Sequence, residues 1–229
     1  MKKVLLSWSS GKDSAWALYR LRQSADVQVA ALVTTFNSSA GRVAMHAVRR
    51  ALVEAQAERM DLPLWPVELP WPCSNAEYET RMRALIERAK AEEIAAFAFG
   101  DLFLQDVREY RIKQLEGTGL EPLFPLWMIP TRQLAEEMIA SGVKARLTCV
   151  DPRKLEKSFA GREFDASLLR DLPLSVDPCG ENGEFHTFVY ACPLFSRPIP
   201  VSNGEIIERE GFVFADVTPQ VTQTHRESF

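Results

Sequence analysis

The sequence predicts an α/β protein, in which a parallel five-stranded sheet with helices on both faces is followed by a smaller α+β domain. Two observations lead to this prediction. Over residues 1–130, five short strand-like runs alternate with helical patterns, an alternation typical of β–α units in a parallel sheet. After residue 130 the pattern changes to helix, strand, helix and then mainly strands. We therefore expect two domains, at 1–130 and 131–229.

The elements of the first domain follow in order. Strands are expected at 4–8, 27–35, 64–69, 94–99 and 122–127. The fourth is apolar throughout, as in a parallel strand covered on both faces. Helices are expected at 14–22, 44–60, 74–91 and 104–115. The third helix opens with Ser74 and Glu77, at the spacing of a capping box.

The second domain should begin with a helix and end in strands. We expect a helix at 131–141, closed by Gly142, then a strand at 143–150 and a helix with turns at 155–171. Further strands are expected at 185–191 and 199–201, and as a pair around Ile206 and 212–217.

Composition excludes several classes of protein. Hydrophobic residues make up 46% and charged residues 25%, which suits a folded enzyme and not a disordered chain. The net charge is −4 and no basic block occurs, so DNA binding is not indicated. No apolar run is long enough to span a membrane. The four cysteines form no Cys-x-x-Cys pair, which favours a reducing cytoplasm over disulfides or a zinc site.

The most informative segment lies between the first strand and the first helix and reads Ser9-Ser10-Gly11-Lys12-Asp13-Ser14. It has neither the spacing of a Walker A loop nor the glycines of a dinucleotide fingerprint. Small residues at a helix start nevertheless suit an anion, because backbone N–H groups and the helix dipole point at it. Lys12 would add a mobile positive charge, and Asp13 could cap the helix or hold Mg²⁺. A plain turn with two capping side chains is the alternative.

The segment resembles the Ser-Gly-Gly-Lys-Asp-Ser loop of the N-type ATP pyrophosphatases, or PP-loop proteins. The resemblance implies an adenine nucleotide alpha hydrolase-like (HUP) fold with strand order 3-2-1-4-5, ATP and Mg²⁺ as cofactors, and cleavage of ATP between the α- and β-phosphates. Ser10 departs from the pattern, where a glycine stands. Serine keeps the turn provided that its φ stays negative.

A second group of residues should face this loop. Gly100 and Asp101 end the fourth strand, which adjoins the first strand at the topological switch point of such a sheet. Asp101 could therefore hold the nucleotide or its metal, or it could cap the next helix. Arg108 and Arg111, at helical i, i+3 spacing, could bind phosphate or an acidic substrate, or be solvated surface charges. By resemblance, His46 would lie near the nucleotide, with a surface histidine as the alternative.

An acidic, glycine-containing loop lies far along the chain at 177–187. Gly180 and Gly183 permit a tight path, so Glu181 and Glu184 could converge. Converging carboxylates suit amine or ammonia binding, a general base or a metal. An acidic solvent-facing hairpin turn is the alternative.

This loop carries the closest family resemblance. Diphthine–ammonia ligases have a Cys-Gly-Glu-x-Gly-Glu-aromatic-x-Thr stretch followed by Cys-Pro-Leu-Phe, matched here by 179–187, which ends at Thr187, and by 192–195. The resemblance implies that Gly180, Gly183 and Thr187 help to bind substrate. The variant loop at Ser9 and the short acidic chain favour a bacterial member of the group.

Together these features predict a ligase that adenylates a carboxylate and passes it to ammonia or an amine. Lys12 and Mg²⁺ would neutralise phosphate charge, Asp13 and Asp101 would hold the metal or nucleotide, and Glu181 with Glu184 would position the acceptor or the amine. The acceptor is a small-molecule or protein-borne carboxylate, which would be diphthine if the chain acts as the characterised members of the group do.

Three other functions share related folds. A tRNA-modifying, thiolating enzyme would use the same loop but usually needs paired cysteines and a basic face. A non-catalytic nucleotide-binding regulator of the universal stress type would carry its phosphate loop after the fourth strand. A flavin-binding electron carrier would be coloured when purified. The sequence leaves a homodimer open.

Overall fold

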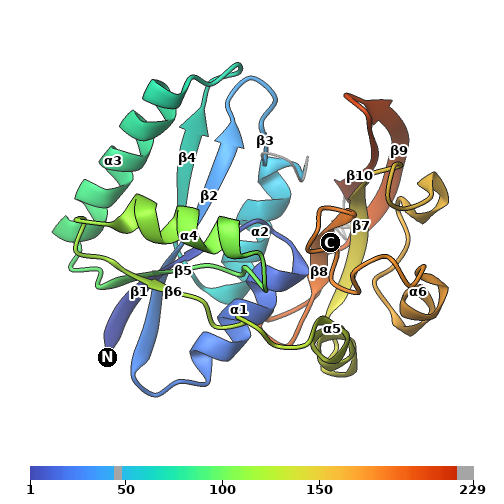
Figure 1. Cartoon of the computed structure of the whole chain (residues 1–229), viewed down its shortest axis with the longest axis horizontal. Helices are drawn as coiled ribbons and strands as arrows, with labels where there is room; N and C mark the ends of the chain where they lie inside the picture. The colour runs from blue at the N-terminus through green and yellow to red at the C-terminus, as the bar shows by residue number, and fades with distance from the viewer. Residues whose placement is uncertain (44–47, 221–229) are drawn as a thin grey trace, which may run out of the picture.

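The structure, a computed structural model, describes residues 1–43 and 48–220 (Figure 1). His46, expected near a nucleotide, lies outside the described residues. Two sheets lie side by side, one built from the first part of the chain and one from the last. Among the described residues, no helix combines the length and apolarity needed to cross a bilayer.

The first sheet is mainly parallel and confirms the predicted α/β class. Its parallel strands are β1 (Lys2–Ser7), β2 (Val27–Asn37), β4 (Leu64–Leu69), β5 (Ala96–Ala98) and β6 (Glu121–Leu123). They pair in the order β4-β2-β1-β5-β6, so the expected order 3-2-1-4-5 is matched by the parallel strands but not by the sheet as a whole. The sheet as a whole holds a sixth strand, β3 (Arg42–Val43), which pairs antiparallel with β2, so a purely parallel five-stranded sheet was only partly correct.

Strand β3 lies directly beyond the end of β1. It pairs with Phe36 and Asn37 of β2, whose opposite edge is occupied by β4 over the same residues. β3 therefore pairs with the other edge of β2, where β1 pairs with the earlier residues Val27 to Val33. A two-residue strand carries no periodic signal, which is why sequence patterns placed the start of a helix close by instead.

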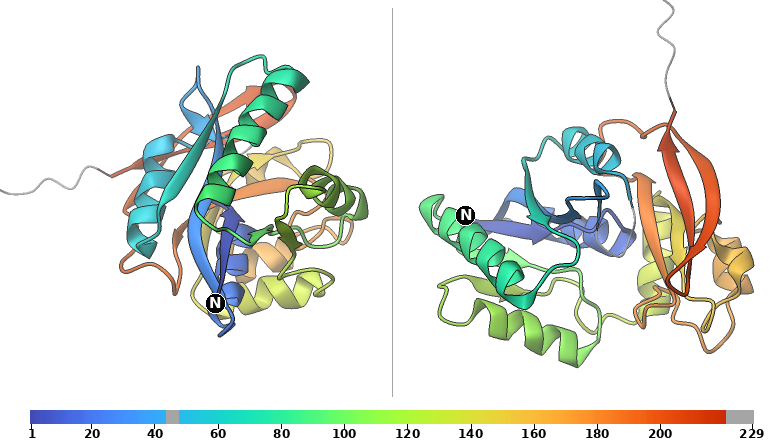
Figure 2. Two further views of the ribbon diagram at one scale, coloured as in Figure 1. Left: turned by 90° about the vertical axis from the view of Figure 1, so that its left-hand side faces the viewer. Right: turned by 90° about the horizontal axis from the view of Figure 1, so that it is seen from above.

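Two pairs of helices cover the sheet (Figures 1 and 2). Helices α1 (Lys12–Arg22) and α2 (Arg50–Met60) pack on one face, and α3 (Asn75–Ala91) and α4 (Gln105–Leu115) on the other. The alternation of side chains along β1 assigns the faces, because Val4 and Leu6 join the α1/α2 core whereas Leu5 joins the α3/α4 core. The predicted capping box of Ser74 and Glu77 opens α3.

Two predicted elements of this part have different bounds. The helix expected from residue 44 begins at Arg50, after β3 and the segment 44–47 outside the description. The strand expected at 122–127 ends at Leu123. The chain then turns, with the Trp127 amide donating to the Phe124 carbonyl and Met128 at a φ of 60°.

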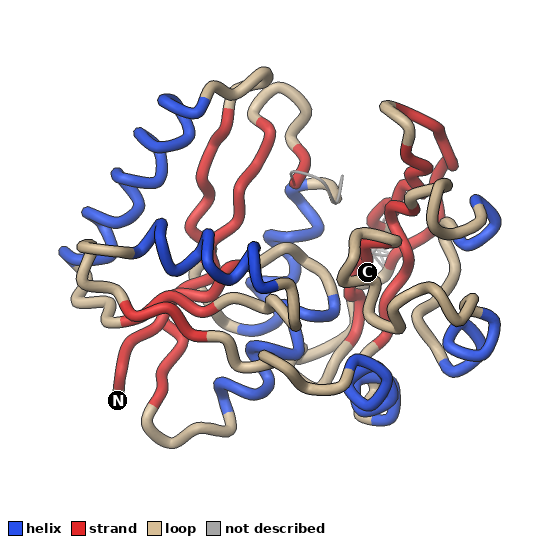
Figure 3. Tube along the Cα trace, in the orientation of Figure 1, coloured by secondary structure: helices blue, strands red, loops and turns tan. Residues whose placement is uncertain are grey.

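The second sheet is antiparallel, with the order β8-β7-β10-β9 (Figure 3). Its strands are β7 (Lys144–Val150), β8 (Phe185–Ala191), β9 (Val201–Arg209) and β10 (Phe212–Pro219). Helices α5 (Thr131–Ala140) and α6 (Ala166–Asp171) and the 3₁₀ turn η1 (Lys157–Phe159) flank it. The strand expected at 199–201 overlaps β9 only at Val201, where β9 begins.

One buried cluster runs from the parallel sheet into the antiparallel one. It contains Leu18 of α1 and Leu52 of α2 together with Leu134 of α5 and Phe188 of β8. The α3/α4 face has a separate core that includes Leu85, Phe97 and Leu115. The first helical layer is therefore shared between the two sheets.

Candidate active site

The loop between β1 and α1 is closed by its own hydroxyl groups. The Ser14 hydroxyl donates to the Gly11 carbonyl at 2.9 Å and lies 3.3 Å from the Ser9 hydroxyl. The Gly11 amide in turn donates to Ser9 Oγ at 3.4 Å. These local contacts begin α1 at Lys12, so the first turn of the helix faces the end of the parallel sheet.

Ser10 adopts the left-handed conformation, with a φ of 71°. Serine was expected to replace glycine here only if its φ stayed negative, and that expectation is therefore wrong. The side chain is fully buried, and its Oγ has no hydrogen-bond partner among the described residues. Both features explain why a glycine suits this position better in the resembling loops.

Replacing Ser10 with glycine is expected to stabilise the protein. Relief of the left-handed strain gives about 1–3 kcal/mol, and the greater freedom of glycine in the unfolded chain removes about 0.4–1 kcal/mol of it. We expect a net gain of roughly 1 kcal/mol in the free energy of unfolding, measured by urea denaturation. Ser10→Ala keeps the strain and is the matched control. An S10G protein less stable than S10A would contradict this account.

The loop is also held by strand β8 of the second sheet. The Val189 amide donates to the Ser10 carbonyl at 3.0 Å, and the Lys12 amide donates to Thr187 Oγ1 at 3.1 Å. A Cβ on Gly11 would meet the Thr187 carbonyl at 3.1 Å, so glycine is needed for this close approach. Thr187 thus contacts the loop itself, whereas it was expected to bind substrate.

Gln56 of α2 also holds the loop against β8. Its side chain is fully buried and accepts a hydrogen bond from Trp8 Nε1 at 2.8 Å. Its amide group donates to the carbonyls of Ser10 and Val189, at 3.1 and 2.6 Å. One side chain therefore joins Trp8, directly after β1, to the loop and to β8.

The Lys12 side chain reaches the Cys179 carbonyl of the acidic loop, and the residue as a whole is 1% exposed. Its ammonium donates to Asp13 Oδ2 at 2.9 Å and to the Cys179 carbonyl. Burial is the largest single influence and lowers the pKa of Lys12, but the charge and hydrogen bond of Asp13, with Cys179 and Glu181, together outweigh it, so the pKa lies above its usual range. The positive charge expected of Lys12 is present, but in this structure hydrogen bonds hold the ammonium group in place, so it is not the mobile group that was expected.

Two carboxylates border the opening of α1. Gly100 passes so close that a Cβ there would lie 3.1 Å from the Asp13 carbonyl carbon, which brings Asp101 to the same end of the sheet. Burial raises the pKa of Asp13 and of Asp101, against the lowering effects of Lys12 and Arg111 respectively. Asp13 Oδ1 is buried and has no hydrogen-bond partner among the described residues.

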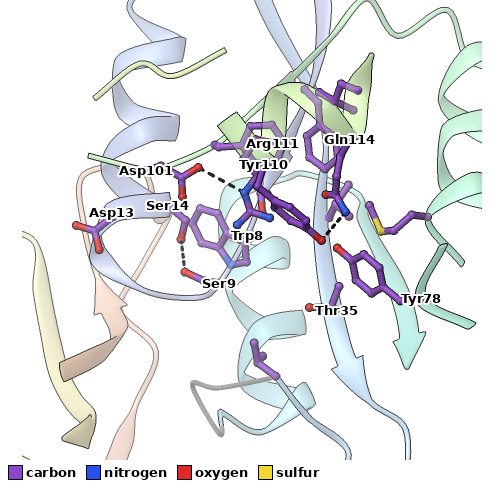
Figure 4. A pocket seen from close by; sticks show the side chains of 18 of the residues that line it. Trp8, Ser9, Asp13, Ser14, Thr35, Tyr78, Asp101, Tyr110, Arg111 and Gln114 are labelled. Atoms are coloured by element: carbon purple, nitrogen blue, oxygen red, sulfur yellow. Dashed lines mark hydrogen bonds and ion pairs between the residues drawn. The ribbon is translucent and has the colours of Figure 1, made fainter. Parts of the chain in front are cut away.

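Arg111 and Arg108 occupy different places. Arg111 lies 3.5 Å from Asp101 and stands over the Phe99 ring, as Figure 4 shows for the ion pair. Arg108 stands over the rings of Phe124 and Trp127. Of the two, only Arg111 borders the cleft described below, so a role of Arg108 in binding substrate there is not supported by its position.

The acidic loop at 177–184 is braced from within. Asp177 accepts hydrogen bonds from the amides of Cys179 and Glu181, at 2.9 and 3.0 Å. Glu184 accepts one from the Asp177 amide at 3.0 Å and another from the Asn182 side chain at 3.1 Å. Gly180 has a φ of 72°, and a Cβ there would lie 2.8 Å from the Phe185 carbonyl. The loop therefore has little freedom.

The expected convergence of Glu181 and Glu184 is wrong. Glu184 is 3% exposed and closes the loop, as does Gly183, at a φ of 80°. Glu181 lines the cleft instead, and its Oε1 accepts a hydrogen bond from the Leu102 amide at 2.8 Å. Burial, with Asp13 and Asp101 nearby, raises the pKa of Glu181 to about 7 despite that bond and Lys12.

The bracing role of Glu184 gives a testable contrast. Glu184→Ala removes both hydrogen bonds and is expected to lower the free energy of unfolding by about 2–4 kcal/mol. Glu184→Gln keeps an oxygen that can accept both bonds and should stay within about 1 kcal/mol of the parent. Urea denaturation at pH 7 measures both. Equal losses in the two variants would mean that the charge, and not the hydrogen bonds, holds the loop.

A cleft of ≈ 1140 Å³ joins these residues. It opens at the end of the parallel sheet and continues between α3 and α4, where Tyr78, Tyr110 and Gln114 border it (Figure 4). The predicted site residues that line it are Ser9, Lys12, Asp13, Ser14, Gly100, Asp101, Arg111, Gly180, Glu181 and Thr187. The predicted residues Ser10, Gly11, Arg108, Gly183 and Glu184 do not line it.

His186 was missed by the analysis of the sequence. It lies on β8 beside Thr187 and lines the cleft. Burial lowers the pKa of His186 to about 4, and Lys12 adds to the lowering, so the imidazole is neutral at pH 7.

Fold and cleft define a class of protein, namely α/β proteins with a ligand cleft at the carboxyl ends of parallel strands. Comparison with known proteins identifies the family. Residues 1–120 match the diphthamide synthase N-terminal domain and residues 130–220 its C-terminal domain. The chain belongs to the diphthamide synthase family.

Relatives with curated names agree with this family. A protein of Bos taurus is 30% identical over 183 residues, which cover 72% of this chain and 67% of the relative. One of Mus musculus is 31% identical with the same coverage, and one of Schizosaccharomyces pombe is 26% identical over 90% of this chain and 37% of the relative. All three are named diphthine–ammonia ligase. The bacterial source favoured by the sequence stays a prediction.

Proposed function

We propose that the protein is an ATP-dependent ligase that forms AMP and pyrophosphate, activating a carboxylate as its adenylate and passing the acyl group to ammonia. The observation that carries the proposal is the cleft, in which the start of α1, Asp101 and Glu181 border one cavity. The names of the relatives support the ligase reaction. The chain is proposed to divide into an ATP-binding domain at 1–130 and a substrate-binding domain at 131–229.

The triphosphate would lie at the opening of α1. The hydroxyls of Ser9 and Ser14 border the cleft there, and the first turn adds backbone N–H groups and the positive end of the helix dipole. Gly100 lacks a side chain where one would press against the Asp13–Ser14 peptide, so this turn stays accessible. Arg111 is near enough to exchange its Asp101 partner for a phosphate oxygen.

The two carboxylates of this corner fit a magnesium ion. Asp13 has a buried oxygen without a hydrogen-bond partner among the described residues. The pKa of Asp101 is raised mainly by burial and, to a smaller extent, by the negative charge of Asp13. Among the described residues no cluster of three or more metal-ligating side chains occurs. Mg²⁺ usually takes one or two carboxylates and completes its shell with phosphates and water, so Asp13 and Asp101 would hold it together with the nucleotide. Bound there, Mg²⁺ supplies charge neutralisation for the phosphates.

The proposed reaction has two steps. An oxygen of the acceptor carboxylate attacks the α-phosphorus, and the bond to the β-phosphate oxygen breaks with release of pyrophosphate. The nitrogen of ammonia then attacks the acyl carbon, and AMP leaves with the electron pair of the acyl–oxygen bond. Glu181, with a pKa of about 7, is suited to take the proton of the incoming ammonium.

The acceptor is proposed to enter from the side of the second sheet, beside Glu181 and His186. Diphthine is the first candidate, because the relatives are named for it. Other carboxylic acids, small or attached to a protein, are the further candidates.

Product analysis tests the proposal. The protein is incubated with ATP, Mg²⁺, ammonia and candidate acids, and nucleotides and pyrophosphate are measured by chromatography. We expect AMP and pyrophosphate in equal amounts. Asp13→Asn should abolish them, whereas Asp106→Asn, exposed on α4, should not. ADP and phosphate as the only products would refute the proposal, and binding of ATP without turnover would indicate a non-catalytic nucleotide-binding protein.

A further inference from the structure

The Lys12 side chain points from the start of α1 toward the second sheet, although it lies in the loop proposed to bind phosphate. We propose that Lys12 is a positioning residue, which fixes the acidic loop at 177–184 against α1 and makes no contact with the phosphates of a nucleotide. The part of the test that concerns phosphate rests on the proposed function. The part that concerns the acidic loop does not.

The ammonium group of Lys12 has two hydrogen-bond acceptors and two aromatic rings around it. Its hydrogen bonds go to the Asp13 carboxylate and the Cys179 carbonyl. The rings of Phe164 and Phe185 lie 5.5 and 5.4 Å from the nitrogen, within the range of cation–π attraction. The side chain is 2% exposed. All but one of these partners come from the second part of the chain.

A phosphate contact would require this arrangement to be dismantled. The ammonium would have to leave the Cys179 carbonyl and both rings, and would leave a buried carbonyl without a donor. The main chain of Lys12 also contacts the second part of the chain, because its amide donates to Thr187 Oγ1. Side chain and main chain thus bind the two ends of the stretch from Cys179 to Thr187.

Fixing this stretch sets the position of Glu181. Glu181 stands two residues after Cys179, and Asp177 holds the amides of both. Because these contacts make the loop stiff, anchoring the Cys179 carbonyl to α1 anchors Glu181 as well. Lys12 also acts on Glu181 by charge, since it lowers the pKa that burial has raised. The lysine therefore couples the phosphate loop to the residue that would take the proton.

The first arm of the experiment measures nucleotide affinity. The affinities of ATP with Mg²⁺ and of AMP are measured by calorimetry for the parent protein and Lys12→Met. The ratio of the two affinities reports the contacts made to the β- and γ-phosphates. We expect the ratio to change by less than about twofold in K12M. A fall of about tenfold or more would overturn the proposal, since it would reveal a lost phosphate contact.

The second arm measures the acidic loop by amide hydrogen exchange. K12M should exchange about tenfold faster at 177–187. Lys154→Met is the matched control, because the Lys154 ammonium also donates to a carbonyl of this loop, that of Asn182 at 2.5 Å, but from an exposed position. It should leave the exchange at Cys179 and Glu181 unchanged. Equal effects of the two variants, or none, would overturn the proposal.

The parent protein alone gives a third readout, which holds even if K12M does not fold. If Lys12 moved to a phosphate, ATP would release the Cys179 carbonyl and speed exchange at 177–187. We expect ATP to leave this exchange unchanged or slower, and acceleration would overturn the inference. Failure of the parent protein to bind ATP would refute the proposed function, while the comparison of K12M with K154M would still decide the role of Lys12.

Discussion

Replacing Gln56 with leucine is expected to lower the free energy of unfolding by about 3–5 kcal/mol. Leucine fills nearly the same space but can neither accept the hydrogen bond of Trp8 Nε1 nor donate to the carbonyls of Ser10 and Val189. A buried polar group left without a partner costs about 1–3 kcal/mol. Ser10 still accepts from the Val189 amide, so the loss at that carbonyl should be the smallest of the three.

Urea denaturation followed by circular dichroism measures this loss. Gln133→Leu is the control, because Gln133 is exposed on α5 and its side chain donates to Glu137 of the same helix. It should change the free energy of unfolding by less than about 0.5 kcal/mol. If Q56L were within about 1 kcal/mol of the parent, the junction of β1, the loop and β8 would not depend on Gln56.

Replacing Glu181 with glutamine is expected to slow amide formation by about 10²–10⁴-fold, the usual contribution of a positioned proton acceptor. The glutamine oxygen can still accept from the Leu102 amide, so the loop should keep its shape. In the parent, the rate should rise as the pH passes through about 7, where Glu181 loses its proton. In E181Q that rise should be absent, whereas the rise caused by free ammonia should remain.

The same variant should gain stability at high pH. The pKa of Glu181 rises from 4.5 to about 7 on folding, so between these values the folded state binds more protons than the unfolded state. Stability therefore falls as the pH rises through this window and stays lower above it. E181Q lacks this loss and should be more stable than the parent at pH 8, but not at pH 4. Denaturation of both proteins at pH 4 and pH 8 measures this. A parent protein that is more stable than E181Q at pH 8 would contradict the prediction.

The fold was largely predictable because its signals are local. The period of apolar residues, the capping box at Ser74 and the closing glycines each depend on a few neighbouring residues. β3 gave no such signal, since two residues cannot show a period. The position of Arg108 over Phe124 and Trp127 could not be predicted, because these rings belong to a later turn of the chain.

The site was predictable as a set of segments but not in its orientation. The segments at 9–14 and 177–187 were both singled out from the sequence, and both contribute residues to the cleft. The direction of the Lys12 side chain and amide depends on Cys179 and Thr187, 167 and 175 residues away. The buried place of Glu184 likewise depends on how the loop folds back on Asp177. Spacing within a motif does not carry such information.

The shared buried cluster has a consequence for dissecting the protein. A polypeptide ending at residue 130 would keep all strands of the parallel sheet but lose Leu134 and Phe188, which belong to the same core as Leu18 and Leu52. The layer of α1 and α2 would then present part of its apolar surface to water. Such a fragment should aggregate or bind hydrophobic dyes, even though the sequence divides cleanly at that point. We therefore expect the cooperative folding unit to extend beyond residues 1–130.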